Sequence, residues 1–181
     1  MSYPETLQHY SCPAWKDFPD IELYMDQVIS ILEKYLSPFS EEEKLVTSTM
    51  INNYVKQKII SPPVNKRYTR AHLAHLFMIC TLKRFMQLSD ICALLRNLEK
   101  DRTPEAAYEL FRAELNGALG RIFEIGEEEK GAKGALGALK SACAAFGSIC
   151  HSRLLFLSAK AAWQEEDEIT LVIQEEKGKG K

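Results

Sequence analysis

The sequence predicts an all-α, mainly helical fold, and two observations support this class. Apolar residues recur at a spacing of three to four in several segments between positions 20 and 163, which is the pattern of amphipathic helices. Residues that commonly cap helix N-termini also stand where the periodic segments begin, and these are Thr47, Thr69, Ser89 and Thr103. The run EITLVI at 168–173 remains open to two interpretations, a short strand or a frayed helix end.

Length and composition indicate a folded protein inside the cell. A chain of 181 residues with 46% hydrophobic residues can form one substantial domain, or a small domain with a helical extension. The N-terminus has no basic segment followed by an apolar one, and charged side chains interrupt the apolar-leaning region 135–163. The five cysteines include no CxxC pair, so we expect free thiols in a reducing compartment. Together these features predict a cytoplasmic protein with no membrane segment.

Charge is unevenly distributed along the chain. Between Lys44 and Asp90 there is no acidic residue, and because the whole chain sums to −2, the remainder must carry about −9. A basic zone of this kind is typical of a surface that binds phosphate. Seven basic residues lie in the zone, namely Lys56, Lys58, Lys66, Arg67, Arg70, Lys83 and Arg84.

The chain begins with a segment that lacks a helical period, and we expect residues 1–19 to form an extended arm that can pin Trp15 onto the body. Asp20 is the expected N-cap of the first helix, which should end near Leu36, before a Ser-Pro pair that disfavours helical backbone. A connector with three glutamates follows at 37–46. The apolar face of this helix is predicted to be Ile21, Tyr24, Met25, Val28, Ile31, Leu32 and Tyr35.

The helix predicted after Thr47 or Ser48 has the most informative polar face. Hydroxyl, carboxamide and amine groups lie on one face because their residues are spaced i, i+3, i+4 and i+7. Asn can bind the N6 and N7 edge of adenine, Thr can reach a base or a phosphate, and Lys binds phosphate. Any surface helix has a polar outer face, but this one lacks the carboxylates that would repel phosphate. The residues of this face are Thr49, Asn52, Asn53 and Lys56.

A loop or short wing with a basic tip should follow, because paired prolines at 62–63 cannot continue the helix. Thr69 then begins a helix through about Met86, whose apolar residues are spread too widely for one stripe, so it should be central and mostly buried. Ser89 begins a shorter helix. These segments predict a domain at 20–101.

Beyond residue 101 the chain contains a second set of helical signals. Thr103-Pro104-Glu105 combines a cap, a proline at the first helical position and an acid at the positive end of the helix dipole. A long helix is predicted for 135–163 after a glycine-rich link, so region 102–166 should form a helical pair that dimerises the protein. The tail at 167–181 should be disordered.

Catalytic and metal sites find little support. His72, His75 and Cys80 come nearest to a metal motif, but no fourth ligand is visible, so two partly exposed imidazoles and a buried thiol are the simpler interpretation. The run GAKGALG lacks the strand and the GK[ST] pair of a phosphate-binding loop. No nucleophile stands beside a histidine and an acid in a recognisable pattern. We therefore expect no enzyme activity, no cofactor and no metal.

The order of these parts resembles a known regulator fold. A polar-faced helix, a Pro-Pro loop, KRYT, an apolar helix and LSDICALL resemble the winged helix-turn-helix of the MerR family, although the connector is longer and the wing shorter. Its parts correspond to Thr49–Ile60, Pro62–Tyr68, Thr69–Met86 and Leu88–Leu95. More closely, AWKDFPDIELYMDQV and MINNYVKQKIISPPVNKRYTRAHLAHL resemble an uncharacterised family of Firmicutes, the YkrK-like proteins, over about Pro13 to Leu98.

The sequence and these resemblances predict a DNA-binding transcriptional regulator that binds double-stranded DNA as a homodimer, with an unknown effector. The alternative is a non-catalytic helical protein-interaction module that kept the scaffold without DNA binding, since fold does not determine function. The connector 37–46 decides between these two functions. If it lets the polar-faced helix protrude, that helix can reach DNA, and if it folds across the helix, it cannot. The predicted DNA-binding residues are Thr49, Asn52, Asn53, Lys56, Lys58, Lys66, Arg67, Tyr68 and Arg70.

Overall fold

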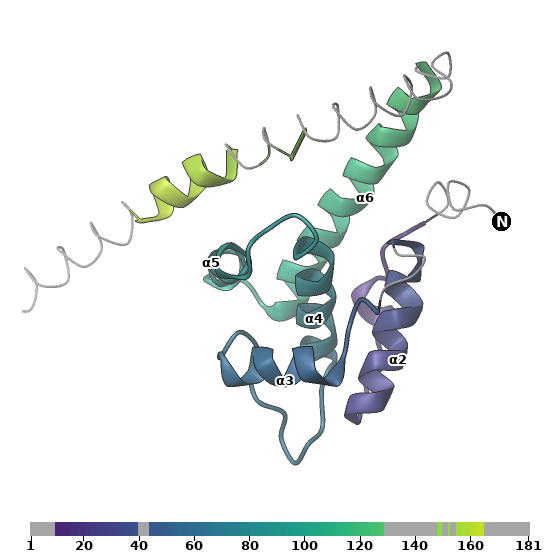
Figure 1. The fold of residues 1–181 in the computed structure, drawn as a ribbon, viewed down its shortest axis with the longest axis vertical. Coiled ribbons are helices and arrows are strands. Elements are labelled where there is room, and N and C mark those ends of the chain that lie inside the picture. The colour runs from purple at the N-terminus through teal and green to yellow at the C-terminus, as the bar shows by residue number, and fades with distance from the viewer. Residues whose placement is uncertain (1–9, 40–43, 129–147, 150–151, 153–154, 165–181) are drawn as a thin grey trace, which may run out of the picture. The chain divides into compact units, whose positions relative to one another are not determined.

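The computed structural model describes residues 10–39, 44–128, 148–149, 152 and 155–164, which are mostly helical, so the predicted class is confirmed. The chain divides into two compact units, Met1–Glu129 and Lys130–Lys181. In the first unit α4 is central and contacts three other helices (Figure 1). The helices of this core are α2 (Met25–Leu36), α4 (Arg70–Leu82), α5 (Leu88–Glu99) and α6 (Pro104–Glu128).

The N-terminal segment packs on the core over residues 10–19, where the predicted arm is attached to the body around Trp15. The short 3₁₀ helix η1 (Trp15–Asp17) packs against α6. The Tyr108 hydroxyl donates to Pro13 O at 2.7 Å, and the Trp15 N–H donates to Glu109 Oε1 at 2.7 Å. Phe18 is buried at 1% exposure. The segment packs on α6 because aromatic burial and these hydrogen bonds outweigh the conformational entropy that the chain loses on ordering.

Helix α2 begins at Met25, so Asp20 is not its N-cap. The backbone before the helix is extended because Leu23 exchanges two hydrogen bonds with Tyr68, both 2.8 Å. The Tyr24 N–H then donates to Gln27 Oε1 at 2.8 Å, which satisfies one backbone donor of the first turn. The helix ends at Leu36, as predicted, and the 3₁₀ turn η2 (Ser37–Phe39) follows.

Helix α3 (Ser48–Lys56) has a defined start and stop. The Thr47 hydroxyl oxygen accepts from the Met50 N–H at 3.2 Å, which confirms the predicted cap. At the other end, the Ile59 N–H donates to Tyr54 O at 2.9 Å and the Lys58 N–H donates to Val55 O at 3.0 Å. This is a Schellman motif, and Lys58 takes the left-handed position at φ 57° that glycine usually fills.

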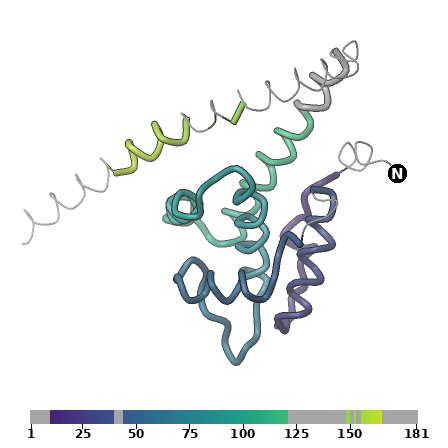
Figure 2. The backbone as a smooth tube through the Cα atoms, in the orientation of Figure 1, coloured from purple at the N-terminus to yellow at the C-terminus, as the bar shows by residue number. Residues whose placement is uncertain are grey.

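A narrow hairpin connects α3 to α4. The Arg67 N–H donates to Val64 O at 2.8 Å, and Asn65 and Lys66 have φ values of 49° and 62°. Two positive φ values within a closed four-residue turn are those of a type I′ turn. In Figure 2 the tube turns back sharply beyond α3 before it enters α4. The predicted loop thus forms a compact hairpin, residues 61–68, which we call the wing.

Helix α4 is the buried centre of the first unit, as predicted. It ends at Leu82, short of the predicted Met86, because the chain tightens into turns in which the Phe85 N–H donates to Leu82 O at 3.1 Å. Burial extends around the helix, which explains why its apolar residues form no single stripe. Its buried residues are His72, Leu73, Ala74, Leu76, Phe77, Met78, Ile79, Cys80 and Thr81.

The last two helices of the first unit pack on each other and on α4. Helix α5 begins at Leu88 with Gln87 at the N-cap, two residues before the predicted cap, Ser89. Helix α6 begins at Pro104, as predicted, and the Ala106 N–H donates to the Thr103 hydroxyl at 3.2 Å. Because Tyr108 is fully buried in the core, the predicted domain boundary after residue 101 falls inside the first unit.

The second unit contains helical residues at 148–149, 152 and 155–164. The Phe156 and Trp163 ring centroids lie 5.9 Å apart with an interplanar angle of 77°. The predicted link after α6, the EITLVI run and the tail lie outside the described residues. None of the helices in the described part of the chain combines the length and hydropathy needed to cross a membrane.

Candidate nucleic-acid interface

The predicted polar face of α3 is exposed in the first unit. Thr49, Asn52, Asn53 and Lys56 are all exposed, whereas Ile51 is fully buried. Helical geometry accounts for the division, because residues spaced i, i+3, i+4 and i+7 share a side of the helix. The described face therefore presents hydroxyl, carboxamide and amine groups to solvent, with no carboxylate in the helix.

A lysine behind α3 holds the start of this helix. Lys83 Nζ donates to Leu45 O at 2.6 Å and lies 3.7 Å from Met50 Sδ. Lys83 belongs to the basic zone, yet its ammonium group is directed to the connector and is partly buried. This residue therefore acts as a structural anchor of α3, and sequence reasoning missed that role.

The described ends of the connector leave the polar face of α3 uncovered. Residues 37–39 continue from α2 as η2, and Val46 is fully buried directly before α3. Residues 40–43 lie outside the described part of the chain. Since Asn52 and Asn53 remain exposed in the presence of both ends, the described connector residues do not fold across them.

The wing lies beside α3 at the same end of the first unit, as Figure 1 shows. Lys58 at the end of α3 and Lys66 in the wing turn are exposed, and both have positive φ values. Val64, also in the wing, is 67% exposed. The wing and α3 thus both present exposed cations at this end of the first unit.

Tyr68 does not belong to this surface, and its prediction as a DNA-binding residue is wrong. Its side chain is only 3% exposed, and its backbone pairs with Leu23. Its ring packs edge-on against His72, with centroids 5.5 Å apart. Burial raises the pKa of Tyr68 above its usual value. Tyr68 therefore anchors the wing to the core, and its ring is not accessible to a duplex.

The two arginines next to Tyr68 have partners within the protein. The Arg67 guanidinium lies 3.6 Å from the centroid of the Tyr24 ring, a cation–π stack. Arg70 Nη2 lies 3.6 Å from Asp20 Oδ1, and the Arg70 guanidinium lies 5.9 Å from the Trp15 ring. The Arg70 side chain is only 21% exposed, so a phosphate would compete with Asp20 for it.

His72 braces the wing from the inside, a role that sequence reasoning missed. Its Nδ1 accepts from the Thr69 N–H at 3.1 Å, and its Nε2 lies 3.2 Å from Ser61 O. It therefore links the first residue of the wing to the cap of α4. Burial, followed by the charge of His75, lowers the pKa of His72, while the Ser61 carbonyl opposes this effect. The i, i+3 spacing of Thr69 and His72 at a helix start could have indicated this brace.

His72, His75 and Cys80, the residues nearest to a metal motif in the sequence, have structural roles instead. His72 binds Ser61 and Thr69, His75 pairs with Glu99, and Cys80 is buried among apolar side chains. Among the described residues, no group of three or more metal-ligating side chains is placed to hold an ion. Burial raises the pKa of the Cys80 thiol to about 11, so this thiol is protonated at neutral pH.

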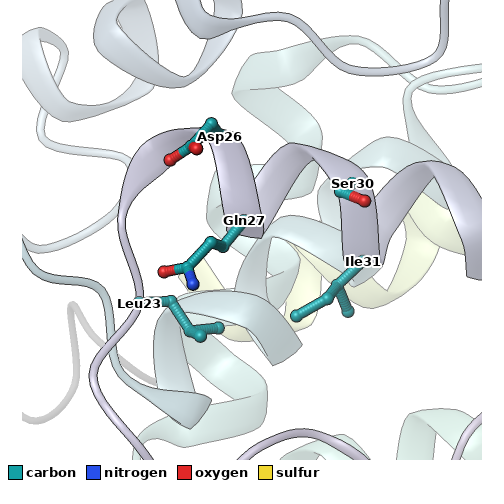
Figure 3. A pocket seen from close by; sticks show the side chains of 5 residues that line it. All are labelled: Leu23, Asp26, Gln27, Ser30 and Ile31. Atoms are coloured by element: carbon teal, nitrogen blue, oxygen red, sulfur yellow. The ribbon is translucent and has the colours of Figure 1, made fainter.

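A shallow pocket of about 430 Å³ lies along the outer side of α2. Figure 3 shows Leu23, Gln27 and Ile31 turned to one side of the helix, with Ser30 and Asp26 completing the lining. The charge at this pocket is that of Asp26, which would repel phosphate. The pocket therefore does not extend the basic surface of α3 and the wing.

Comparison with known proteins places the chain in a family. A model described as "Domain of unknown function (DUF1836)" matches residues 13–111. The chain belongs to the DUF1836 family. No curated protein and no solved structure matches the chain. The range that defines DUF1836 includes η1, the four helices α2 to α5, the wing and the first turns of α6, which together form most of the described first unit.

Proposed function

We propose that this DUF1836 protein binds double-stranded DNA through α3 and the wing and acts as a transcriptional regulator. The observation that carries the proposal is the exposed Thr49, Asn52, Asn53 and Lys56 face, which contains no carboxylate and belongs to the same end of the first unit as the wing cations. The predicted order of a helix, a wing and a further helix, similar to the MerR family, supports the same function. The proposed site of action is the cytoplasm.

The chemistry of α3 suits a major groove. A carboxamide such as that of Asn53 can donate to N7 of adenine and accept from its N6 amino group as a bidentate pair. Thr49 lies one turn before Asn53 and can contact a base edge or a phosphate. Because Asn52 and Asn53 are exposed and adjacent in sequence, they can contact two neighbouring bases, or one base and the DNA backbone.

Affinity would come mainly from phosphate contacts. Lys56, Lys58 and Lys66 are exposed, and none has an ion-pair partner among the described residues. Each lysine that neutralises a phosphate releases counterions, so binding should weaken as salt rises. The proposed contacts of Thr49, Asn52, Asn53 and these lysines rest on exposure and chemistry. Arg67 and Arg70 are proposed as further contacts from the rim of the surface.

A homodimer is the proposed functional form, because one α3 helix offers few base contacts and a second copy doubles them over two half-sites. Among the described helical residues of the second unit, Ile149 is 46% exposed, Leu155 60% and Leu157 46%. Exposed apolar side chains of this kind favour contact with a partner helix. These same side chains equally support the alternative, a protein-interaction module.

Duplex binding measured at two salt concentrations tests the proposal. The full-length protein should bind labelled random-sequence DNA more weakly at the higher salt. Lys56→Ala and Lys66→Ala should each make the salt slope shallower by about one. Lys34→Ala, which removes an exposed lysine of α2, is the matched control and should leave the slope unchanged. Absence of salt-dependent binding to random and promoter-derived DNA alike would reject DNA binding and favour the interaction module.

A further inference from the structure

Tyr24 is half exposed, at 49%, although its place in the apolar pattern of the first helix predicted burial. Its ring instead carries the Arg67 guanidinium at 3.6 Å from the ring centroid. The two residues come from different elements, the N-cap of α2 and the end of the wing. No local signal in the sequence indicates this pair, because only the folded chain brings the two residues together.

The backbone around the pair is held in place. Leu23 and Tyr68, the neighbours of Tyr24 and Arg67, exchange hydrogen bonds of 2.8 Å in both directions. The Arg67 N–H also closes the wing turn by donating to Val64 O. The position of the Arg67 backbone is therefore set without its side chain. What remains to be fixed is the direction of the long Arg67 side chain, and the Tyr24 ring fixes it.

Stacking keeps a guanidinium available for an anion. A guanidinium has five N–H donors that lie in its plane, so contact with a ring face leaves the donor edges open. Among the described residues, none accepts a hydrogen bond from the Arg67 guanidinium. Lys66, its neighbour in the wing, is exposed. A planar donor edge beside a second cation matches the geometry of a phosphate group.

We infer that Tyr24 is a positioning residue that orients the Arg67 guanidinium toward a phosphate of duplex DNA. This inference rests on the proposed function and adds a residue of α2 to the proposed interface. The ring of Tyr24 acts through Arg67 and makes no contact of its own with the phosphate. Pre-orienting the side chain lowers the entropy lost when the phosphate binds.

The role of Tyr24 as N-cap can be separated from its role under Arg67. The cap uses the Tyr24 backbone N–H, which donates to Gln27, and this bond survives replacement of the side chain. Tyr24→Ala therefore removes the ring and keeps the helix start. Tyr24→Phe keeps the ring. Ile21→Ala is the matched control, because Ile21 is an apolar residue of the same segment and is 66% exposed.

The experiment combines DNA affinity with an observation on the free protein. Duplex affinity is measured for the wild type, Tyr24→Ala, Tyr24→Phe, Ile21→Ala, Arg67→Ala and the Tyr24→Ala/Arg67→Ala double variant. Tyr24→Ala should weaken binding roughly two- to fivefold, while Tyr24→Phe and Ile21→Ala leave it unchanged. In the Arg67→Ala background, Tyr24→Ala should have no further effect. NMR of the free protein should show a ring-current shift on the Arg67 Nε–H that Tyr24→Ala removes.

The outcomes distinguish the inference from the proposed function. If the wild type binds DNA but the effects of Tyr24→Ala and Arg67→Ala simply add, the inference fails and the proposed function stands. The inference also fails alone if Tyr24→Phe loses as much affinity as Tyr24→Ala. If the wild type shows no salt-dependent binding while the ring-current shift is present, the proposed function fails, and Tyr24 then only stabilises the wing.

Discussion

The two ends of the first unit differ in how they use their side chains. The α3 and wing end exposes cations and carboxamides that have few partners within the protein, whereas the η1 and α6 end is a buried cluster of aromatic rings. In that cluster Phe18 lies 5.2 Å from Tyr108 and 6.2 Å from Phe77, measured between ring centroids. The α3 and wing end should therefore tolerate substitution without loss of stability, and the η1 and α6 end should not.

The largest expected effect lies in the aromatic cluster. Phe18→Ala should lower the free energy of unfolding by about 3–5 kcal/mol, because it removes a buried ring and leaves a cavity between Tyr35, Phe77 and Tyr108. Urea denaturation of the full-length protein measures the loss. Phe85→Ala is the control, since Phe85 is 51% exposed and should cost far less. Equal losses for the two variants would contradict the assigned core.

At the opposite end, Asn53→Ala should change binding without changing stability. Loss of a bidentate base contact should lower sequence discrimination by roughly 1–3 kcal/mol, while the unfolding free energy changes by less than about 0.5 kcal/mol. Competition between a selected duplex and random DNA measures discrimination. Gln87→Ala, which removes an exposed carboxamide next to α5, should leave discrimination unchanged. An unchanged preference in Asn53→Ala would exclude a base contact by this residue.

His72 braces the wing against the start of α4 and should make stability depend on pH. Its folded-state pKa lies below 6.5, so the unfolded chain takes up a proton that the folded chain does not. Stability should therefore fall as pH drops below about 6.5, by at most about 1.4 kcal/mol per pH unit. Urea midpoints measured from pH 7.5 to 5.5 test this. In His72→Gln the fall should be smaller, and an identical pH profile would contradict the prediction.

The smallest effect concerns the wing turn. Lys66→Gly should raise stability by about 0.5–1 kcal/mol, since Asn-Gly is the preferred pair for a type I′ turn and Lys66 has a φ of 62°. The same change should make the salt slope of DNA binding shallower by about one. Lys66→Ala should change the slope equally without the gain in stability. A loss of stability in Lys66→Gly would contradict the turn assignment.

Much of the fold could be predicted from sequence because helix signals are local. Thr47 and Thr103 cap their helices as predicted, and the wide spread of apolar residues in α4 indicated its burial. Predictions failed where a distant partner decided the structure. Tyr68 stands in a basic run but is buried, because its backbone pairs with Leu23 and its ring packs on His72.

The candidate site shows the same division. The spacing of Thr49, Asn52, Asn53 and Lys56 placed them correctly on one exposed face, because helical geometry alone determines which residues share a side. The partners of the basic residues were not predictable, because they lie far along the chain. Lys83 donates to Leu45 O, Arg70 pairs with Asp20, and Arg67 stacks on Tyr24. The missing signal in each case was a tertiary contact that leaves no local pattern.

By itself, the sequence determined the helical class, the caps of α3 and α6, and the charge of α3 and the wing. These properties depend on residue type and on spacing within one turn of chain. Only the tertiary structure decided that α6 holds the N-terminal segment, that Tyr24 supports Arg67 and that Tyr68 is buried. The physical reason is that burial and backbone pairing depend on which distant segments meet, and this becomes defined only when the whole unit packs.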